Sequence, residues 1–141
     1  MKILVVTDDA EAAATIIMSI RFRWPNSNEV LLGDGSGFLT KEQLIDVSLI
    51  IIDGAMQNTM AAIMEIRRFS EIPIIFVSEP LGTQIDTAHV LSMGKSDYVF
   101  KPIIMADLVF AIETITDQSK ELPNHDLSRA FGIWANKKVG T

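Results

Sequence analysis

Short apolar runs alternate along this chain with segments in which apolar residues recur every three or four positions. Five of the runs have the length and the β-branched content of strands, at residues 3–6, 30–32, 49–52, 74–77 and 98–100. Apolar strands without polar residues at alternate positions are typical of a parallel sheet that is covered on both sides. The alternation therefore predicts an α/β fold, a doubly wound five-stranded parallel sheet with helices on both faces.

Three of the intervening segments have the spacing of amphipathic helices. Their apolar stripes are Ala13, Ile16, Ile17 and Ile20; Ala62, Ile63, Ile66 and Phe69; and Leu108, Ala111, Ile112 and Ile115. We expect the first helix to end before Pro25, because proline disfavours a helical conformation in the residue that precedes it. Weaker stripes predict two further helices near residues 40–47 and 86–93.

The length and composition predict one domain followed by a short appendage. With 141 residues, of which 48% are hydrophobic, the chain has enough apolar surface for one core and is too short for two. We expect this domain in residues 1–117 and a linker with a C-terminal tail in residues 118–141. A polar stretch around Pro123 indicates the linker, and the tail has helical spacing at Leu127, Phe131 and Trp134.

Charge and residue usage narrow the expected partners and location. The net charge is −6 and the basic residues do not cluster, so we expect no direct contact with nucleic acid. No apolar stretch approaches the roughly 20 residues that cross a bilayer, so we expect no membrane contact either. The chain has no cysteine, which excludes a disulfide framework and suits the cytoplasm.

Polar side chains follow four of the five predicted strands. In the flavodoxin-like strand order 2-1-3-4-5, the carboxyl ends of these strands meet at one edge of the sheet, where ligands of open α/β sheets bind. The residues expected at this edge are Thr7, Asp8 and Asp9 after the first strand, Asp53 after the third, Ser78 after the fourth and Lys101 after the fifth.

These residue types together favour phosphate chemistry on a carboxylate. Clustered carboxylates repel one another and need a cation or protons to relieve them, and oxygen ligands of this kind favour Mg²⁺. A lysine and a hydroxyl opposite the carboxylates provide the cation and the donor that phosphoryl oxygens require. Asp53, at the centre of the sheet, is the natural nucleophile.

The same segments resemble the receiver domains of bacterial two-component response regulators, the CheY-like family. The resemblance covers residues 2–115 and is carried by four motifs: KILVVTDD with its acidic pair, LIIIDGAM around Asp53, PIIFVS ending in Ser78, and LSMGKSDYVFKP with the pattern G-x-x-[DG]-Y-x-x-K-P. It implies a cytoplasmic signalling switch that catalyses only its own phosphorylation and dephosphorylation and is otherwise not an enzyme.

The resemblance also implies a role for each site residue. Asp53 would accept a phosphoryl group from the phosphohistidine of a sensor kinase or phosphotransfer protein. Asp9 would bind Mg²⁺ directly and Asp8 largely through water, with the backbone carbonyl of Ala55 completing the metal site. Lys101 would bind the phosphoryl oxygens.

The implied switch depends on two further side chains. Ser78 would move towards the phosphoryl group, and Tyr98 would then rotate inward. This would rearrange the face formed by the fourth helix, fifth strand and fifth helix, through which a downstream protein or a second copy of the chain could bind.

Three residues depart from the pattern of the family. Gln57 and Ala61 stand where the family usually has proline and glycine, and Glu79 replaces a small residue after the switch hydroxyl. Glu79 would either repel the incoming phosphate or turn away. The departures leave open a pseudo-receiver, a module that binds partners without being phosphorylated.

Two enzymes remain as rival classes. A flavin- or nucleotide-binding protein would place its phosphate after the first strand, where Asp8, Asp9 and Glu11 would repel it. A hydrolase that forms an aspartyl phosphate would need a second acid two residues after the nucleophile, where this chain has Ala55.

Overall fold

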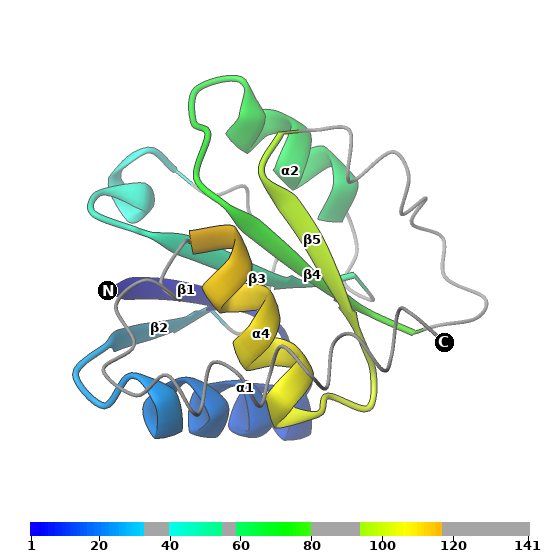
Figure 1. Ribbon diagram of the computed structural model, residues 1–141. Helices are drawn as coiled ribbons and strands as arrows, with labels where there is room; N and C mark the ends of the chain where they lie inside the picture. Colours follow the sequence, from blue (N-terminus) through cyan, green and yellow to red (C-terminus); the bar gives the residue numbers. More distant parts are fainter. Residues whose placement is uncertain (33–39, 55–58, 80–93, 117–141) are drawn as a thin grey trace.

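A single parallel sheet forms the centre of the molecule (Figure 1). The computed structural model describes residues 1–32, 40–54, 59–79 and 94–116. Its strands follow the order β2-β1-β3-β4-β5, which confirms the predicted doubly wound sheet and its strand order. The strands are β1 (Lys2–Val6), β2 (Asn28–Leu32), β3 (Leu49–Asp53), β4 (Ile74–Ser78) and β5 (Ser96–Phe100).

Helices cover both faces of the sheet, as the apolar runs predict. Helices α1 (Ala10–Arg23) and α4 (Met105–Thr116) pack on one face, where Ile16, Ile20 and Ile112 join the core. Helix α2 (Thr59–Arg67) covers the opposite face (Figure 1). Because β3 and β4 are buried along their whole length, each of their apolar side chains contributes roughly 1.5–3 kcal/mol of hydrophobic stabilisation.

Helix α1 begins and ends where local chemistry requires. The Asp9 side chain caps its first turn by accepting hydrogen bonds from the backbone N–H groups of Glu11 and Ala12, at 3.1 and 3.2 Å. The helix ends at Arg23, and Trp24 is its C-cap residue. The predicted end before Pro25 is confirmed.

The prediction of a helix near residues 40–47 is wrong. Only a 3₁₀ turn, η1 (Glu42–Leu44), forms there. Ile45 is extended, with ψ of 126°, and Asp46 takes a left-handed conformation with φ of 62°, so the backbone turns away from a helical path. The buried positions Leu44 and Val47, which produced the helical spacing, reach the core from this turn.

Several predictions concern residues outside the described part of the chain. These are the helix near residues 86–93 and the linker and tail at 118–141. Among the residues that the structure does describe, no helix is long and apolar enough to span a bilayer.

Candidate functional site

The carboxyl ends of the strands bring the predicted site residues to one edge of the sheet. In the register of the sheet, Asp53 pairs with Val77, and Ser78 pairs with Phe100. The backbone N–H of Lys101 donates to the carbonyl of Ser78 at 2.8 Å, which fixes the chain after β5 beside the end of β4. Asp53 and Ser78 are therefore the last residues of β3 and β4, and Lys101 directly follows β5 beside them.

Asp53 is a buried carboxylate, and two donors share one of its oxygens. Its residue is only 2% exposed. Its Oδ2 accepts a hydrogen bond from the hydroxyl of Thr7 at 2.8 Å and another from Nζ of Lys101 at 2.9 Å. The backbone carbonyl of Asp53 accepts from the hydroxyl of Thr59 at 3.1 Å. A buried charge needs such partners, because burial without them costs several kcal/mol.

Lys101 joins two carboxylates of the site. Its Nζ lies 2.9 Å from Oδ2 of Asp53 and 3.4 Å from Oδ2 of Asp9. Burial lowers the pKa of Lys101, but the hydrogen bonds and charges of Asp53 and Asp9 outweigh it, so the net shift is upward from the ordinary value of 10.5. The side chain is therefore an ammonium ion at neutral pH.

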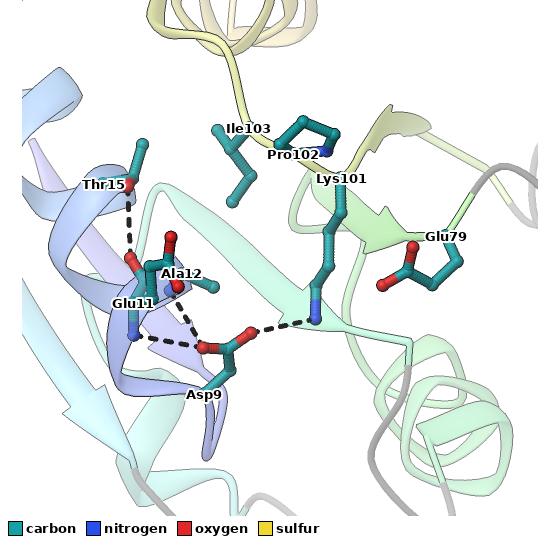
Figure 2. Close-up of a pocket in the computed structure, with 8 residues that line it drawn as sticks. All are labelled: Asp9, Glu11, Ala12, Thr15, Glu79, Lys101, Pro102 and Ile103. Carbon is teal, nitrogen blue, oxygen red and sulfur yellow. Dashed lines mark hydrogen bonds and ion pairs between the residues drawn. The ribbon is translucent and has the colours of Figure 1, made fainter.

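Asp9 serves the helix and the site at the same time. Its Oδ1 caps α1, and its Oδ2 faces Lys101 (Figure 2). The hydrogen bond from the backbone N–H of Ala12 is the largest cause that lowers the pKa of its carboxyl. Burial opposes this effect, and the hydrogen bond and charge of Lys101 add to the lowering, so the net shift is downward. Asp9 is therefore negatively charged at neutral pH.

The three predicted metal-binding carboxylates do not form one cluster. Within the described ranges, no group of three acidic or histidine side chains is arranged to hold a metal ion, and Asp8 is exposed. Ala55 lies outside those ranges. Asp9 and Asp53 nevertheless face the same cation, and Mg²⁺ typically takes one or two protein carboxylates with water as its remaining ligands. The donor set of two carboxylates fits this ion.

Ser78 carries a buried hydroxyl that lacks a hydrogen-bond partner among the described residues. The residue is 3% exposed, and its Oγ is enclosed. Buried hydroxyl groups in proteins nearly always have partners, so this hydroxyl has its hydrogen available for a group that reaches the end of β4.

Tyr98 is half-buried in β5. It packs against the core between the sheet and α2, and its ring lies 4.9 Å from that of Phe100, centroid to centroid. Its side chain thus already has apolar contacts on the side of the sheet that α2 covers.

A cavity of about 350 Å³ opens beside the charged cluster. Its lining includes Asp9, Glu11, Glu79, Lys101 and Ile103 (Figure 2). Glu79 is exposed on the wall and does not fill this space. The cavity therefore leaves room for a small anion next to Lys101, although Glu79 adds negative charge to its rim.

Two threonines in the site had no role assigned from the sequence. Thr7 was recognised only as a polar residue at the end of a strand, and Thr59 was not singled out. Both hydroxyl groups donate to Asp53, one to its side chain and the other to its carbonyl. The only sequence signal for Thr7 is a hydroxyl at the carboxyl end of a buried strand.

Comparison with known proteins identifies relatives over nearly the whole chain, although no family model matches. The transcriptional regulatory protein BaeR of Escherichia coli O6:H1 is 28% identical over 130 residues, which cover 91% of this chain and 52% of BaeR. The DNA-binding response regulator MtrA of Mycobacterium tuberculosis H37Rv is also 28% identical, over 92% of this chain and 56% of MtrA. The chain thus spans about half the length of these relatives.

A solved structure with the same architecture is the N-terminal domain of the nisin resistance regulator NsrR, a lantibiotic response regulator. It is 28% identical, with a TM-score of 0.62 over 82% of this chain and 97% of that domain. Fold and site together define a CheY-like receiver domain. The named relatives place this receiver domain among the bacterial response regulators of two-component signalling.

The expectation that the protein has no direct nucleic-acid partner is contradicted by these relatives. MtrA is named a DNA-binding response regulator, and BaeR is a transcriptional regulatory protein. The expectation came from the net charge of −6, which describes 141 residues, whereas the relatives are about twice as long. The charge of this segment does not determine what a longer regulator binds.

One prediction concerns Asp97, which precedes Tyr98 in β5. Burial raises the pKa of the Asp97 carboxyl above its ordinary value of 3.8, against a hydrogen bond from the backbone N–H of Tyr98 that lowers it. The folded state therefore binds this proton more tightly than the unfolded state, and stability falls as the pH rises through the range between the two pKa values. Asp97→Asn should raise the melting temperature at pH 7.

The pH dependence of this variant provides its control. The gain should shrink as the pH is lowered and should vanish well below 3.8, where the carboxyl is protonated in both states. Melting curves followed by circular dichroism across this range measure the difference. A variant that melts at or below the wild-type temperature at pH 7 would show that the charge of Asp97 does not destabilise the folded protein.

Proposed function

We propose that this protein is a phosphorylation-dependent signalling switch in which Asp53 accepts a phosphoryl group from a histidine kinase of a two-component phosphorelay. The observation that carries the proposal is the arrangement on three successive strands. Asp53 is buried against the ammonium of Lys101, and Ser78 holds an enclosed hydroxyl without a partner in the described part of the chain. These are the nucleophile, the cation and the donor that an aspartyl phosphate requires.

Each residue of the site has a separate role in the phosphoryl transfer. The Asp53 carboxylate attacks the phosphorus of the donor's phosphohistidine; as the new O–P bond forms, the P–N bond breaks and its electron pair returns to the imidazole of the donor. The ammonium of Lys101, which neutralises Asp53 before transfer, then binds the phosphoryl oxygens. Asp9 and Asp53 would hold a Mg²⁺ ion, the metal that receiver domains generally bind. When bound, it supplies positive charge that offsets the charge of the phosphoryl oxygens. Asp8, exposed beside Asp9, would reach that ion through water.

The same groups convert phosphorylation into a change of surface. The phosphoryl group adds roughly 1.5–2 negative charges and strong acceptor oxygens, which draw the hydroxyl of Ser78 towards Asp53. Tyr98, which is half-buried in β5, would turn further inward as Ser78 moves. A switch from mostly inactive to mostly active requires contacts that differ by about 5 kcal/mol between the two states.

The proposal also covers the downstream target of the signal and the cellular location of the protein. Relatives named as transcriptional and DNA-binding regulators support an output that ends at DNA, within the longer proteins of this class. For a protein that takes its phosphoryl group from a histidine kinase, we propose a location in the cytoplasm.

The direct test is phosphorylation with a small phosphodonor and Mg²⁺. Intact-mass spectrometry should show the gain of one phosphoryl group, and peptide mapping should place it on Asp53. The same mixture with a chelator in place of Mg²⁺ should show little gain. No gain with either the donor or a cognate kinase would instead support the pseudo-receiver, which the negative charge of Glu79 on the rim of the cavity would favour.

Ser78→Ala should separate phosphorylation from the switch. The variant removes the hydroxyl that we expect to bind the phosphoryl group, while Asp53 and Lys101 remain in place. Mass spectrometry should find it phosphorylated, but the NMR shift of Tyr98 on phosphorylation should be lost. Ser78→Thr, which keeps a hydroxyl, is the matched control and should restore that shift. A shift of Tyr98 that persists in Ser78→Ala would rule out the serine as the link.

A further inference from the structure

Thr7 connects the loop after β1 to the side chain of Asp53. The residue is 3% exposed, and its backbone N–H donates to the carbonyl of Leu32 at 3.2 Å. Its hydroxyl accepts a hydrogen bond from the backbone N–H of Asp9 at 3.0 Å and donates to Oδ2 of Asp53 at 2.8 Å. Thr7 is therefore held by the end of β2 on one side and by the backbone of Asp9 on the other, with its hydroxyl directed at the reacting carboxylate.

The direction of these hydrogen bonds follows from the chemistry of a hydroxyl. A threonine hydroxyl has one hydrogen to donate and lone pairs to accept with. Because the N–H of Asp9 can only donate, it occupies a lone pair of Oγ1. The hydrogen of the hydroxyl is then directed to Asp53, whose ionised carboxylate can only accept.

We propose that Thr7 shortens the lifetime of the phosphorylated state by stabilising the Asp53 carboxylate as a leaving group. This inference rests on the function proposed for Asp53. In hydrolysis, a water molecule attacks phosphorus and the bond between phosphorus and the Asp53 oxygen breaks. The electron pair of that bond returns to the carboxylate, and water supplies the oxygen and protons of the inorganic phosphate that departs. The returning charge is shared by both carboxylate oxygens, so a donor on either one stabilises it.

The charge on Asp53 determines the sign of the effect. The Thr7 hydrogen bond is stronger to a full carboxylate than to the neutral acyl oxygen of an aspartyl phosphate, because charge-assisted hydrogen bonds are the stronger kind. Thr7 therefore favours the transition state for loss of the phosphoryl group over the phosphorylated state. For the same reason it makes Asp53 a weaker nucleophile when the phosphoryl group is added.

Two substitutions in the full chain separate the hydroxyl from the packing of the side chain. Thr7→Val keeps the branched shape and loses the hydroxyl, whereas Thr7→Ser keeps the hydroxyl and loses the methyl group. After phosphorylation by a small donor with Mg²⁺ and removal of the donor, intact mass follows the decay. We expect Thr7→Val to prolong the half-life about tenfold, the scale of a weakened transition-state donor, and Thr7→Ser to restore a short half-life.

The controls distinguish this inference from the proposed function itself. Thr114→Val makes the same change at an exposed position of helix α4 and should leave the half-life unchanged. Thr7→Ala, a second variant without the hydroxyl, should also decay slowly and replaces Thr7→Val if that variant does not fold. Decay at the wild-type rate in the hydroxyl-free variants, or slow decay in Thr7→Ser, would overturn the role of the hydroxyl. A wild-type protein that takes up no phosphoryl group would overturn the proposed function and this inference together.

Discussion

Asp53→Asn should abolish phosphorylation by a small phosphodonor and Mg²⁺. An amide has the shape of the carboxylate and keeps an oxygen that can accept from Thr7, but its oxygen is too weak a nucleophile to attack phosphorus. Intact-mass spectrometry should find no gain in the variant under conditions in which the wild-type protein gains one phosphoryl group.

The matched control is Asp97→Asn, which makes the same chemical change in β5 at a carboxyl that accepts from the backbone N–H of Tyr98. It should be phosphorylated like the wild-type protein. A full gain of mass in Asp53→Asn would show that another residue accepts the group, and loss in both variants would point to a general disturbance of the fold.

Lys101→Met should destabilise the protein by about 3–5 kcal/mol when Mg²⁺ is absent, the usual cost of removing one partner of a buried ion pair. The reason is that Asp53 is 2% exposed, so its charge cannot turn to water when the ammonium 2.9 Å away is removed. Urea unfolding in the presence of a chelator measures the difference. Asp53→Asn in the same chain should recover most of the loss, because it removes the charge that Lys101 neutralises.

The pH dependence gives this prediction a second check. Because the pKa of Lys101 is raised in the folded protein, its contribution should be complete below its ordinary value of 10.5 and should disappear as the pH rises through the folded value. Lys95→Met, on an exposed residue just before β5, is the control and should cost little. Equal and small losses in the two lysine variants would contradict a stabilising pair at the site.

The sheet could be predicted because a strand that is buried on both faces is apolar at successive positions, and such runs can be recognised in the sequence. β1, β3 and β4 are buried almost throughout, so their apolar runs are continuous. The failed helix near residues 40–47 shows the limit of this reasoning. Leu44 and Val47 are both buried, and their spacing of three is equally compatible with a single turn. The left-handed backbone at Asp46 ends any helical path, and it cannot be predicted from the spacing of apolar residues.

The site could be predicted only as far as strand order determines it. Parallel strands in the order 2-1-3-4-5 bring their carboxyl ends together, and this placed Asp53, Ser78 and Lys101 correctly on neighbouring strands. Which groups touch depends on side-chain directions that spacing does not encode. The sequence suggested a trio of carboxylates, whereas Lys101 joins only Asp9 and Asp53.

The measurement that tests the central claim most directly is an NMR titration of the full chain with Mg²⁺ and beryllofluoride, a mimic of the phosphoryl group. We expect saturable shifts at the amides of Ser78 and Lys101 only when both reagents are present, and none in Asp53→Asn. Shifts that leave Ser78 and Lys101 unmoved, or that persist unchanged in Asp53→Asn, would contradict a phosphoryl group held between these two residues on Asp53.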